Sequence, residues 1–99
     1  PFYLNIAETV PALMAGNTVV LKPAQLTPWS GSEYGRIVAE ETDIPPGVFN
    51  VVCGDRDTGR ALVSHPTPEL VSITGSTRAG KEVAAAAAAS DRSSAPTSC

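Results

Sequence analysis

The stretch Leu70-Val71-Ser72-Ile73-Thr74-Gly75-Ser76-Thr77-Arg78-Ala79-Gly80 says most about the fold of this chain. Its first half is rich in β-branched residues, which favours a short strand. A glycine and a serine follow, and an alanine-rich run begins just beyond them, which favours a strand that turns directly into a helix. Such a turn brings free backbone N–H groups and the positive end of a helix dipole to one point. The stretch therefore predicts a phosphate-binding turn.

Two known phosphate motifs compete at this turn. Residues 75–81 fit the opening of a P-loop, G-x-x-x-x-G-K, but Glu82 stands where that motif needs Ser or Thr for its magnesium ion. The dinucleotide fingerprint G-x-G-x-x-G is not met either, because Thr77 occupies the position of its middle glycine. The P-loop interpretation is disfavoured, and the turn alone does not identify the phosphate.

The rest of the chain alternates between helical and strand patterns. An unbroken apolar run such as Thr18-Val19-Val20-Leu21 is typical of a buried parallel strand, and Thr27-Pro28 is a strong helix start. Strands and helices joined by short loops imply right-handed crossovers and a parallel sheet. We predict an incomplete α/β, Rossmann-like parallel sheet of three strands with flanking helices. Residues 6–14 are expected to be the end of a helix, and further helices are expected over residues 27–41, from a cap at Asp57 or Thr58 through Val63, and from Ser76 or Thr77 to Ala89. The expected strands cover residues 18–21, 48–52 and 70–73.

Ligands of parallel α/β sheets bind at the carboxyl ends of the strands. That rule places Lys22, the Cys53-Gly54 loop and the turn at residues 74–76 along one edge of the predicted sheet. A single glycine after a strand is more often a turn residue than a functional one, but three such loops on one edge favour a functional role. We expect this edge to hold the binding site.

Composition and charge limit the class of protein. Ninety-nine residues allow at most one small domain, and a net charge of −3 without any Lys/Arg cluster disfavours nucleic-acid binding. No apolar run is long enough to span a membrane. The two cysteines lack the spacing of a disulfide framework or a metal site, so we expect no metal and a reducing, cytoplasmic setting. The chain opens on Pro1 rather than Met, which suggests a piece of a longer protein.

Several segments together resemble the aldehyde dehydrogenase superfamily. They occur in the family's order and spacing across residues 1–89, which are thereby identified as a partial NAD(P)-binding domain. The segments are Met14-Ala15-Gly16-Asn17-Thr18-Val19-Val20-Leu21-Lys22-Pro23-Ala24, then Thr27-Pro28, Pro45-Pro46-Gly47-Val48-Phe49-Asn50-Val51-Val52 with Gly54, Ser64-His65-Pro66, and Ile73-Thr74-Gly75-Ser76-Thr77 with Gly80.

The resemblance implies a set of residues that contact NAD or NADP. In the family, the lysine that corresponds to Lys22 hydrogen-bonds the adenosine ribose. Gln25 stands where the family often has Glu, which repels a 2′-phosphate, so we expect NADP to be tolerated alongside NAD. Two glycines match the loop beside the adenine, and the turn after the third strand matches the pyrophosphate site. The complete set is Lys22, Pro23, Ala24, Gln25, Gly54, Gly59, Thr74, Gly75 and Ser76.

The same resemblance implies chemistry that this chain does not carry. The family oxidises aldehydes by attack of a Cys thiolate, with a Glu as general base and an Asn amide in the oxyanion hole. The family's Trp-Asn pair is expected before Pro1, and its Glu and Cys beyond residue 99, so no catalytic residue is assigned. We expect a fragment of an NAD(P)-dependent aldehyde dehydrogenase, inactive in isolation, whose parent is a homo-oligomer. The alternative is a non-catalytic nucleotide-binding or subunit-association module.

Four other residues are interpreted as structural. His65 has no nearby Cys or Asp in the sequence, and Cys53 follows an apolar strand and is expected to be a small core residue. Trp29 and Tyr34 are expected to pack on their helix rather than stack on a ligand.

The tail, residues 90–99, departs from the family. The family continues toward a Leu-Glu-Leu-Gly-Gly strand, whereas this chain reads Asp91-Arg92-Ser93-Ser94-Ala95-Pro96-Thr97-Ser98-Cys99. A shifted reading frame from Arg92 can spell a family-like continuation, so we hypothesise a frameshift or sequencing error near residues 90–92. The alternative is a disordered end, for which the Ser/Pro/Thr composition is also suitable.

Overall fold

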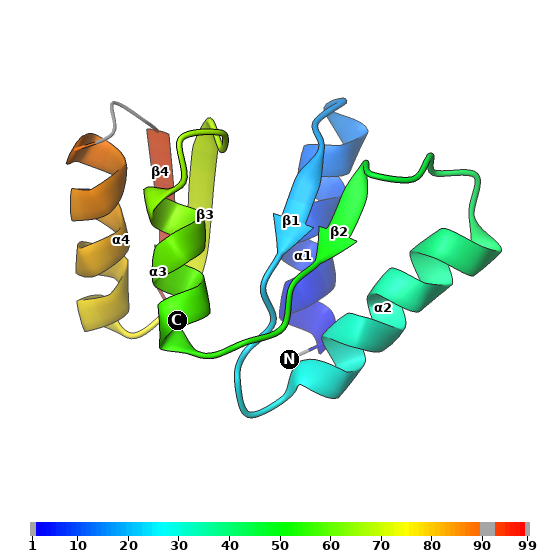
Figure 1. The fold of residues 1–99 in the computed structure, drawn as a ribbon, viewed down its shortest axis with the longest axis horizontal. Coiled ribbons are helices and arrows are strands. Elements are labelled where there is room, and N and C mark those ends of the chain that lie inside the picture. Colours follow the sequence, from blue (N-terminus) through cyan, green and yellow to red (C-terminus); the bar gives the residue numbers. More distant parts are fainter. Residues whose placement is uncertain (1, 90–92, 99) are drawn as a thin grey trace. The chain divides into compact units, whose positions relative to one another are not determined.

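A computed structural model describes residues 2–89 and 93–98. The chain has the element order α1-β1-α2-β2-α3-β3-α4-β4, so its α/β, Rossmann-like class is confirmed (Figure 1). Its contacts divide it into two compact units, Pro1–Asp55 and Arg56–Cys99. Each unit has one pair of parallel strands with helices packed on it.

The first unit contains α1 (Phe2–Met14), β1 (Val19–Leu21), α2 (Pro28–Glu41) and β2 (Phe49–Val51). The two strands are parallel, with Val19 opposite Phe49 and Leu21 opposite Val51. The backbone N–H of Val52 donates to the carbonyl of Leu21 at 2.9 Å, so the pairing continues to the carboxyl ends of both strands. Helix α2 makes the connection between these parallel neighbours, as the sequence predicts.

Two glycines in the left-handed region shape the loops of this unit. Gly16 has φ of 88° and ends α1, where the Asn17 N–H donates to the Ala12 carbonyl at 3.1 Å and the Gly16 N–H to the Leu13 carbonyl at 3.0 Å. These two bonds form a Schellman cap, which confirms the expected helix end. Gly47, with φ of 87°, allows the turn that leads into β2.

The core of the first unit mixes apolar and polar contacts. Leu21, Tyr34 and Val38 are buried together, and Phe49 and Val51 of β2 pack against them. Helix α1 buries two polar residues, Asn5 and Thr9, instead of the apolar ones its composition suggests. The Thr9 hydroxyl donates to the Asn5 carbonyl at 2.6 Å and lies 2.8 Å from the Tyr34 hydroxyl. Tyr34 therefore packs on its helix as predicted, whereas Trp29 is 80% exposed and the packing prediction for it is wrong.

The second unit contains α3 (Arg56–Ser64), β3 (Leu70–Gly75), α4 (Thr77–Ala89) and β4 (Ser93–Ser98). Strands β3 and β4 run parallel, from Leu70 opposite Ser93 to Gly75 opposite Ser98. Helix α4 packs against both strands and against α3, and its Ala87 is fully buried. The short helix begins at Arg56, ahead of both Asp57 and Thr58, which the sequence suggests as its cap.

The residues that the structure describes form four strands in two pairs, where the sequence predicts three strands in one sheet. The fourth strand is β4, at residues 93–98, where the composition favours a disordered end. Ser, Ala, Pro and Thr carry little strand signal, but ladder hydrogen bonds join backbone groups, and every residue of β4 except Pro96 has an N–H group to donate. The proposed frameshift point at residues 90–92 lies outside the described residues, and the frameshift stays a hypothesis.

Within the described part of the chain, every helix is too short or too polar to cross a lipid bilayer.

Candidate cofactor-binding site

The loop after β1 carries four of the nine candidate residues, and we call it the Lys22 loop (residues 22–25). Lys22 is half-buried, and its ammonium donates to the carbonyl of Pro23 at 3.4 Å. Pro23 is fully buried, whereas Ala24 and Gln25 are exposed. The loop closes when the Thr27 N–H donates to the Ala24 carbonyl at 3.0 Å. The lysine ammonium keeps two further N–H donors for a ligand, since one of its three is used here.

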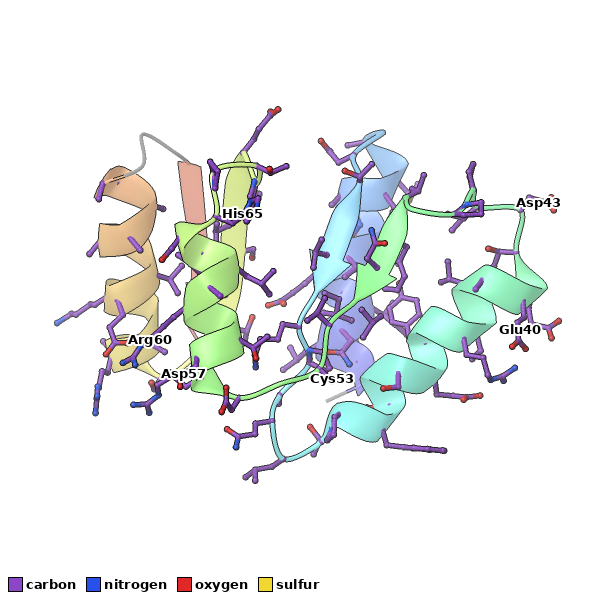
Figure 2. All side chains as sticks on the ribbon, viewed as in Figure 1. Glu40, Asp43, Cys53, Asp57, Arg60 and His65 are labelled. Carbon is purple, nitrogen blue, oxygen red and sulfur yellow. The ribbon has the colours of Figure 1, made fainter. Side chains whose placement is uncertain are left out.

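The second candidate segment follows β2. Gly54 is half-buried and lies one residue beyond Cys53, which Figure 2 shows just past the end of the strand. Cys53 is exposed, so its interpretation as a core residue is wrong. Because β2 ends at Val51, the alternation of inward and outward side chains no longer decides the direction at position 53. Its Sγ atom lies 3.3 Å from the Ser32 hydroxyl oxygen.

A groove runs between α2 and β2 next to this segment. Its volume is about 540 Å³, and it contains none of the nine candidate residues. The lining residues are Ser32, Gly35, Phe49, Asn50, Val51, Val52 and Cys53. The groove therefore lies between α2 and the end of β2 and does not include the predicted phosphate or ribose contacts.

The junction between β3 and α4 is the best-formed part of the candidate site. We call it the Ser76 turn (residues 74–76), and Thr74 and Gly75 within it are the last two residues of β3. The Ser76 hydroxyl accepts a hydrogen bond from the Ala79 N–H at 3.2 Å, so it caps α4 in the manner expected of an N-cap serine. The Gly80 N–H donates to the Ser76 carbonyl at 3.0 Å. A Cβ built at Gly75 would meet no atom within 4 Å, so a ligand can approach the backbone there.

These features fit a pyrophosphate group. The first N–H groups of a helix have no partner within the helix and point out of its N-terminus. The Ser76 hydroxyl accepts through its oxygen and still has a proton to donate, and Gly75 leaves the space beside it open. An anion can therefore be held here by backbone amides and one hydroxyl together.

One ion pair lies in the first turns of α4, next to the Ser76 turn. Arg78 lies in the first turn of α4, and its Nε donates to the Glu82 carboxylate at 3.2 Å. Glu82, the residue that argues against a P-loop, is thus paired with a cation one helical turn away.

In the first unit, the Arg36 guanidinium hydrogen-bonds the Glu33 carboxylate and lowers its pKa from the ordinary value. Arg36 also reaches the Glu40 carboxylate at 2.6 Å.

The candidate residues fall into both units. Lys22, Pro23, Ala24, Gln25 and Gly54 belong to the first, and Gly59, Thr74, Gly75 and Ser76 belong to the second. Within the first unit, the Lys22 loop and Gly54 follow neighbouring parallel strands, as the sequence predicts. Gly59 lies inside α3 instead of a loop. The placement of all three segments along one edge stays a prediction.

The remaining residues singled out in the sequence form no further site. His65 is exposed, and its Nδ1 accepts a hydrogen bond from the Thr67 N–H at 3.1 Å, which agrees with a structural role. Among residues 2–89 and 93–98, no three His, Cys, Asp or Glu side chains gather in a way that could hold a metal ion. The sequence did not reveal the Thr9–Tyr34 hydroxyl pair or the close contact of Gly31 with Pro23. The only signal for the latter is the spacing of two glycines, Gly31 and Gly35, within one helix.

The comparisons with known proteins agree with this architecture. The family model described as "Aldehyde dehydrogenase family" matches residues 1–96. A 3,6-anhydro-alpha-L-galactose dehydrogenase from Streptomyces coelicolor is 49% identical over 86 residues, which are 86% of this chain and 17% of that protein. A betaine aldehyde dehydrogenase from Rhizobium etli is 51% identical over 81% of this chain and 16% of its own length. The chain belongs to the aldehyde dehydrogenase family.

Solved structures show the same fold. An aldehyde dehydrogenase of Mycobacterium tuberculosis complexed with NAD+ matches with a TM-score of 0.91 and 38% identity, over 95% of this chain and 19% of that one. A lactaldehyde dehydrogenase from Escherichia coli also has a TM-score of 0.91 and 38% identity, over 97% of this chain and 20% of its own. The chain thus spans about a fifth or less of the length of these relatives.

Proposed function

We propose that this chain supplies the contacts to the adenosine and pyrophosphate of NAD(P) in an aldehyde dehydrogenase. The single observation that carries the proposal is the Ser76 turn, where a parallel strand ends in an open glycine and a capped helix N-terminus follows directly. When bound, the cofactor supplies the hydride acceptor for oxidation of an aldehyde to a carboxylic acid. The chain's own residues bind and orient it, and the nucleophile, base and oxyanion amide of the reaction come from elsewhere in the full-length enzyme.

Each part of the cofactor is assigned to its own group of residues. Lys22 donates from its free N–H groups to the adenosine ribose, and exposed Gln25 lies close by in the chain to hydrogen-bond the same sugar. Gly54 and Gly59 border the adenine. The Ser76 turn holds the pyrophosphate with backbone amides and a hydroxyl. Supporting this assignment, a relative with 38% identity and the same fold forms a complex with NAD+.

The choice between NAD and NADP depends on Gln25. A glutamate at this position would place a negative charge beside the ribose and repel a 2′-phosphate, whereas the neutral amide hydrogen-bonds without repulsion. We therefore propose that both dinucleotides bind, and that the parent enzyme is able to use both.

Calorimetric titration of the chain with NAD+ and with NADP+ tests the proposal. We expect both dinucleotides to bind. Lys22→Met should weaken both by roughly tenfold, the effect of losing a charge-assisted hydrogen bond worth about 1.4 kcal/mol. Gln25→Glu should weaken NADP+ while it preserves NAD+, and Gln25→Asn serves as the neutral control. Absence of binding by both dinucleotides would overturn the proposal, and equal loss for both in Gln25→Glu would overturn the assignment of Gln25.

A second function, subunit association, is favoured by the surface of the first unit. Several large apolar side chains there are exposed, above all Leu26 at 92%, together with Tyr3, Met14 and Trp29. Such side chains in a folded protein are often covered by another polypeptide surface. A homo-oligomeric parent enzyme is consistent with this observation, and both functions can reside in the same segment.

A further inference from the structure

Two glycines on α2 allow unusually close packing. Gly31 and Gly35 lie four residues apart, and therefore on the same side of the helix. A Cβ built at Gly31 would lie 2.6 Å from the Cβ and 2.7 Å from the Cγ of Pro23. A Cβ built at Gly35 would lie 2.8 Å from the Cγ2 of Val51. Glycine is unfavourable inside a helix, so its presence at two tight contacts has a packing explanation.

The two contacts differ in what they touch. At Gly35 the neighbour is a terminal methyl group of a half-buried strand residue, which can move by a change of side-chain conformation. At Gly31 the neighbours are ring atoms of Pro23, which is less than 2% exposed. Because the proline ring is bonded to its own backbone nitrogen, it cannot rotate away. Any side chain at position 31 must therefore displace the backbone of the Lys22 loop or the start of α2.

A third residue closes the space around this contact. The Nδ2 of Asn5 would lie 3.6 Å from a Cβ at position 31, and Asn5 is 8% exposed. The first turns of α2, the Lys22 loop and α1 thus meet at one point, with no room left for a larger residue. The same Nδ2 has no hydrogen-bond partner among the described residues, so the contact is one of shape rather than of polar bonding.

We propose that Gly31 is a positioning residue for the cofactor, acting through Pro23 on the Lys22 loop. The inference rests on the proposed function, in which Lys22 and Gln25 hold the adenosine ribose. The Pro23 carbonyl accepts from the Lys22 ammonium at 3.4 Å, and the next carbonyl accepts from the Thr27 N–H at 3.0 Å. A displacement of Pro23 therefore moves the ammonium and the turn that presents Gln25 together.

The test compares Gly31→Ala with Gly35→Ala in the isotope-labelled chain. Without cofactor, amide NMR shifts in Gly31→Ala should change in the Lys22 loop, whereas those in Gly35→Ala should change along β2. On addition of NAD+, Gly31→Ala should bind roughly tenfold more weakly, and Gly35→Ala within about twofold of the unchanged chain. Wild-type affinity in Gly31→Ala would overturn the inference, as would an equal loss in both variants.

A double variant covers the case in which Gly31→Ala fails to fold. In Pro23→Gly the clashing Cβ and Cγ atoms are absent, so adding Gly31→Ala should raise the stability of that variant, because alanine is the better helix residue. In the unchanged chain the same substitution should lower stability. If Gly31→Ala changed the free energy of unfolding in the same direction with Pro23 and with Gly at position 23, the proposed clash between position 31 and Pro23 would be overturned. Failure of the unchanged chain to bind NAD+ would overturn the proposed function instead. The cofactor-free spectra and the stability measurements do not involve NAD+, so they test the effect of Gly31 on the Lys22 loop separately.

Discussion

At the scale of single residues, Tyr34 makes both apolar and polar contacts in the core of the first unit. Its ring packs edge-on to Phe2 at a centroid distance of 6.0 Å and tilted against Phe49 at 4.7 Å. Its hydroxyl lies 2.8 Å from that of Thr9, 25 residues away in the chain. The sequence predicted that Tyr34 packs on its helix, but nothing in the sequence predicted that α1 turns polar residues toward it.

Tyr34→Phe should lower the free energy of unfolding by about 1 kcal/mol, the usual contribution of a buried hydrogen bond. The ring and its aromatic contacts are kept, so the change reports the hydroxyl alone. Urea titration followed by circular dichroism measures it. Tyr3→Phe is the matched control, since Tyr3 is 78% exposed, and it should change stability by less than about 0.5 kcal/mol. Equal effects of the two substitutions would contradict the importance of the Thr9 contact.

At the scale of elements, the two predicted helix starts behave differently. Thr27 stands at the N-cap position of α2, with Pro28 as the first helical residue, but its side chain makes no capping hydrogen bond. Ser76 does cap α4, through the Ala79 N–H. Sequence alone locates both positions, because both residue types are common at helix starts. It does not reveal which hydroxyl reaches the backbone, since that depends on the dihedral angles of the approaching loop.

Ser76→Ala should therefore lower the free energy of unfolding by about 1 kcal/mol, whereas Thr27→Ala should cost distinctly less. Ser76→Ala should also speed hydrogen exchange of the Ala79 amide, whose acceptor it removes. Denaturant titration and exchange monitored by NMR measure both effects. A larger loss for Thr27→Ala, or unchanged exchange at Ala79, would show that the cap does not stabilise α4.

At the scale of the whole molecule, local patterns and the parallel pairing of β1 with β2 were predicted, whereas the pairing of β3 with β4 was not. The strand at residues 18–21, the Schellman end at Gly16 and the helix that starts at the Ser76 turn all follow from short-range rules and are confirmed. Strand β4 was missed because it pairs with β3 through backbone groups, and its Ser, Pro and Thr residues are not typical of a strand. Cys53 and Trp29 were assigned to the interior because local apolar patterns cannot tell which surfaces lack a covering partner.

The exposed apolar side chains have a consequence for the chain in solution. Leu26 and Trp29 lie 92% and 80% exposed, and we expect the chain to self-associate as its concentration rises. The double substitution Leu26→Gln, Trp29→Gln should reduce that association, while Glu41→Gln, an exposed polar change at the end of α2, should not. Analytical ultracentrifugation over a concentration series measures the mass. A strictly monomeric unchanged chain would contradict the expectation.

The most direct test of the cofactor assignment is a residue-by-residue NMR titration of the chain with NAD+. We predict that amide shifts gather in two places, at Lys22 and Gln25 of the first unit and from Gly75 to Arg78 of the second. Pyrophosphate alone should reproduce only the shifts in the second unit, because the ribose and adenine contacts belong to other segments. Shifts confined to other residues, such as the groove beside β2, or no shifts at saturating NAD+, would contradict the account.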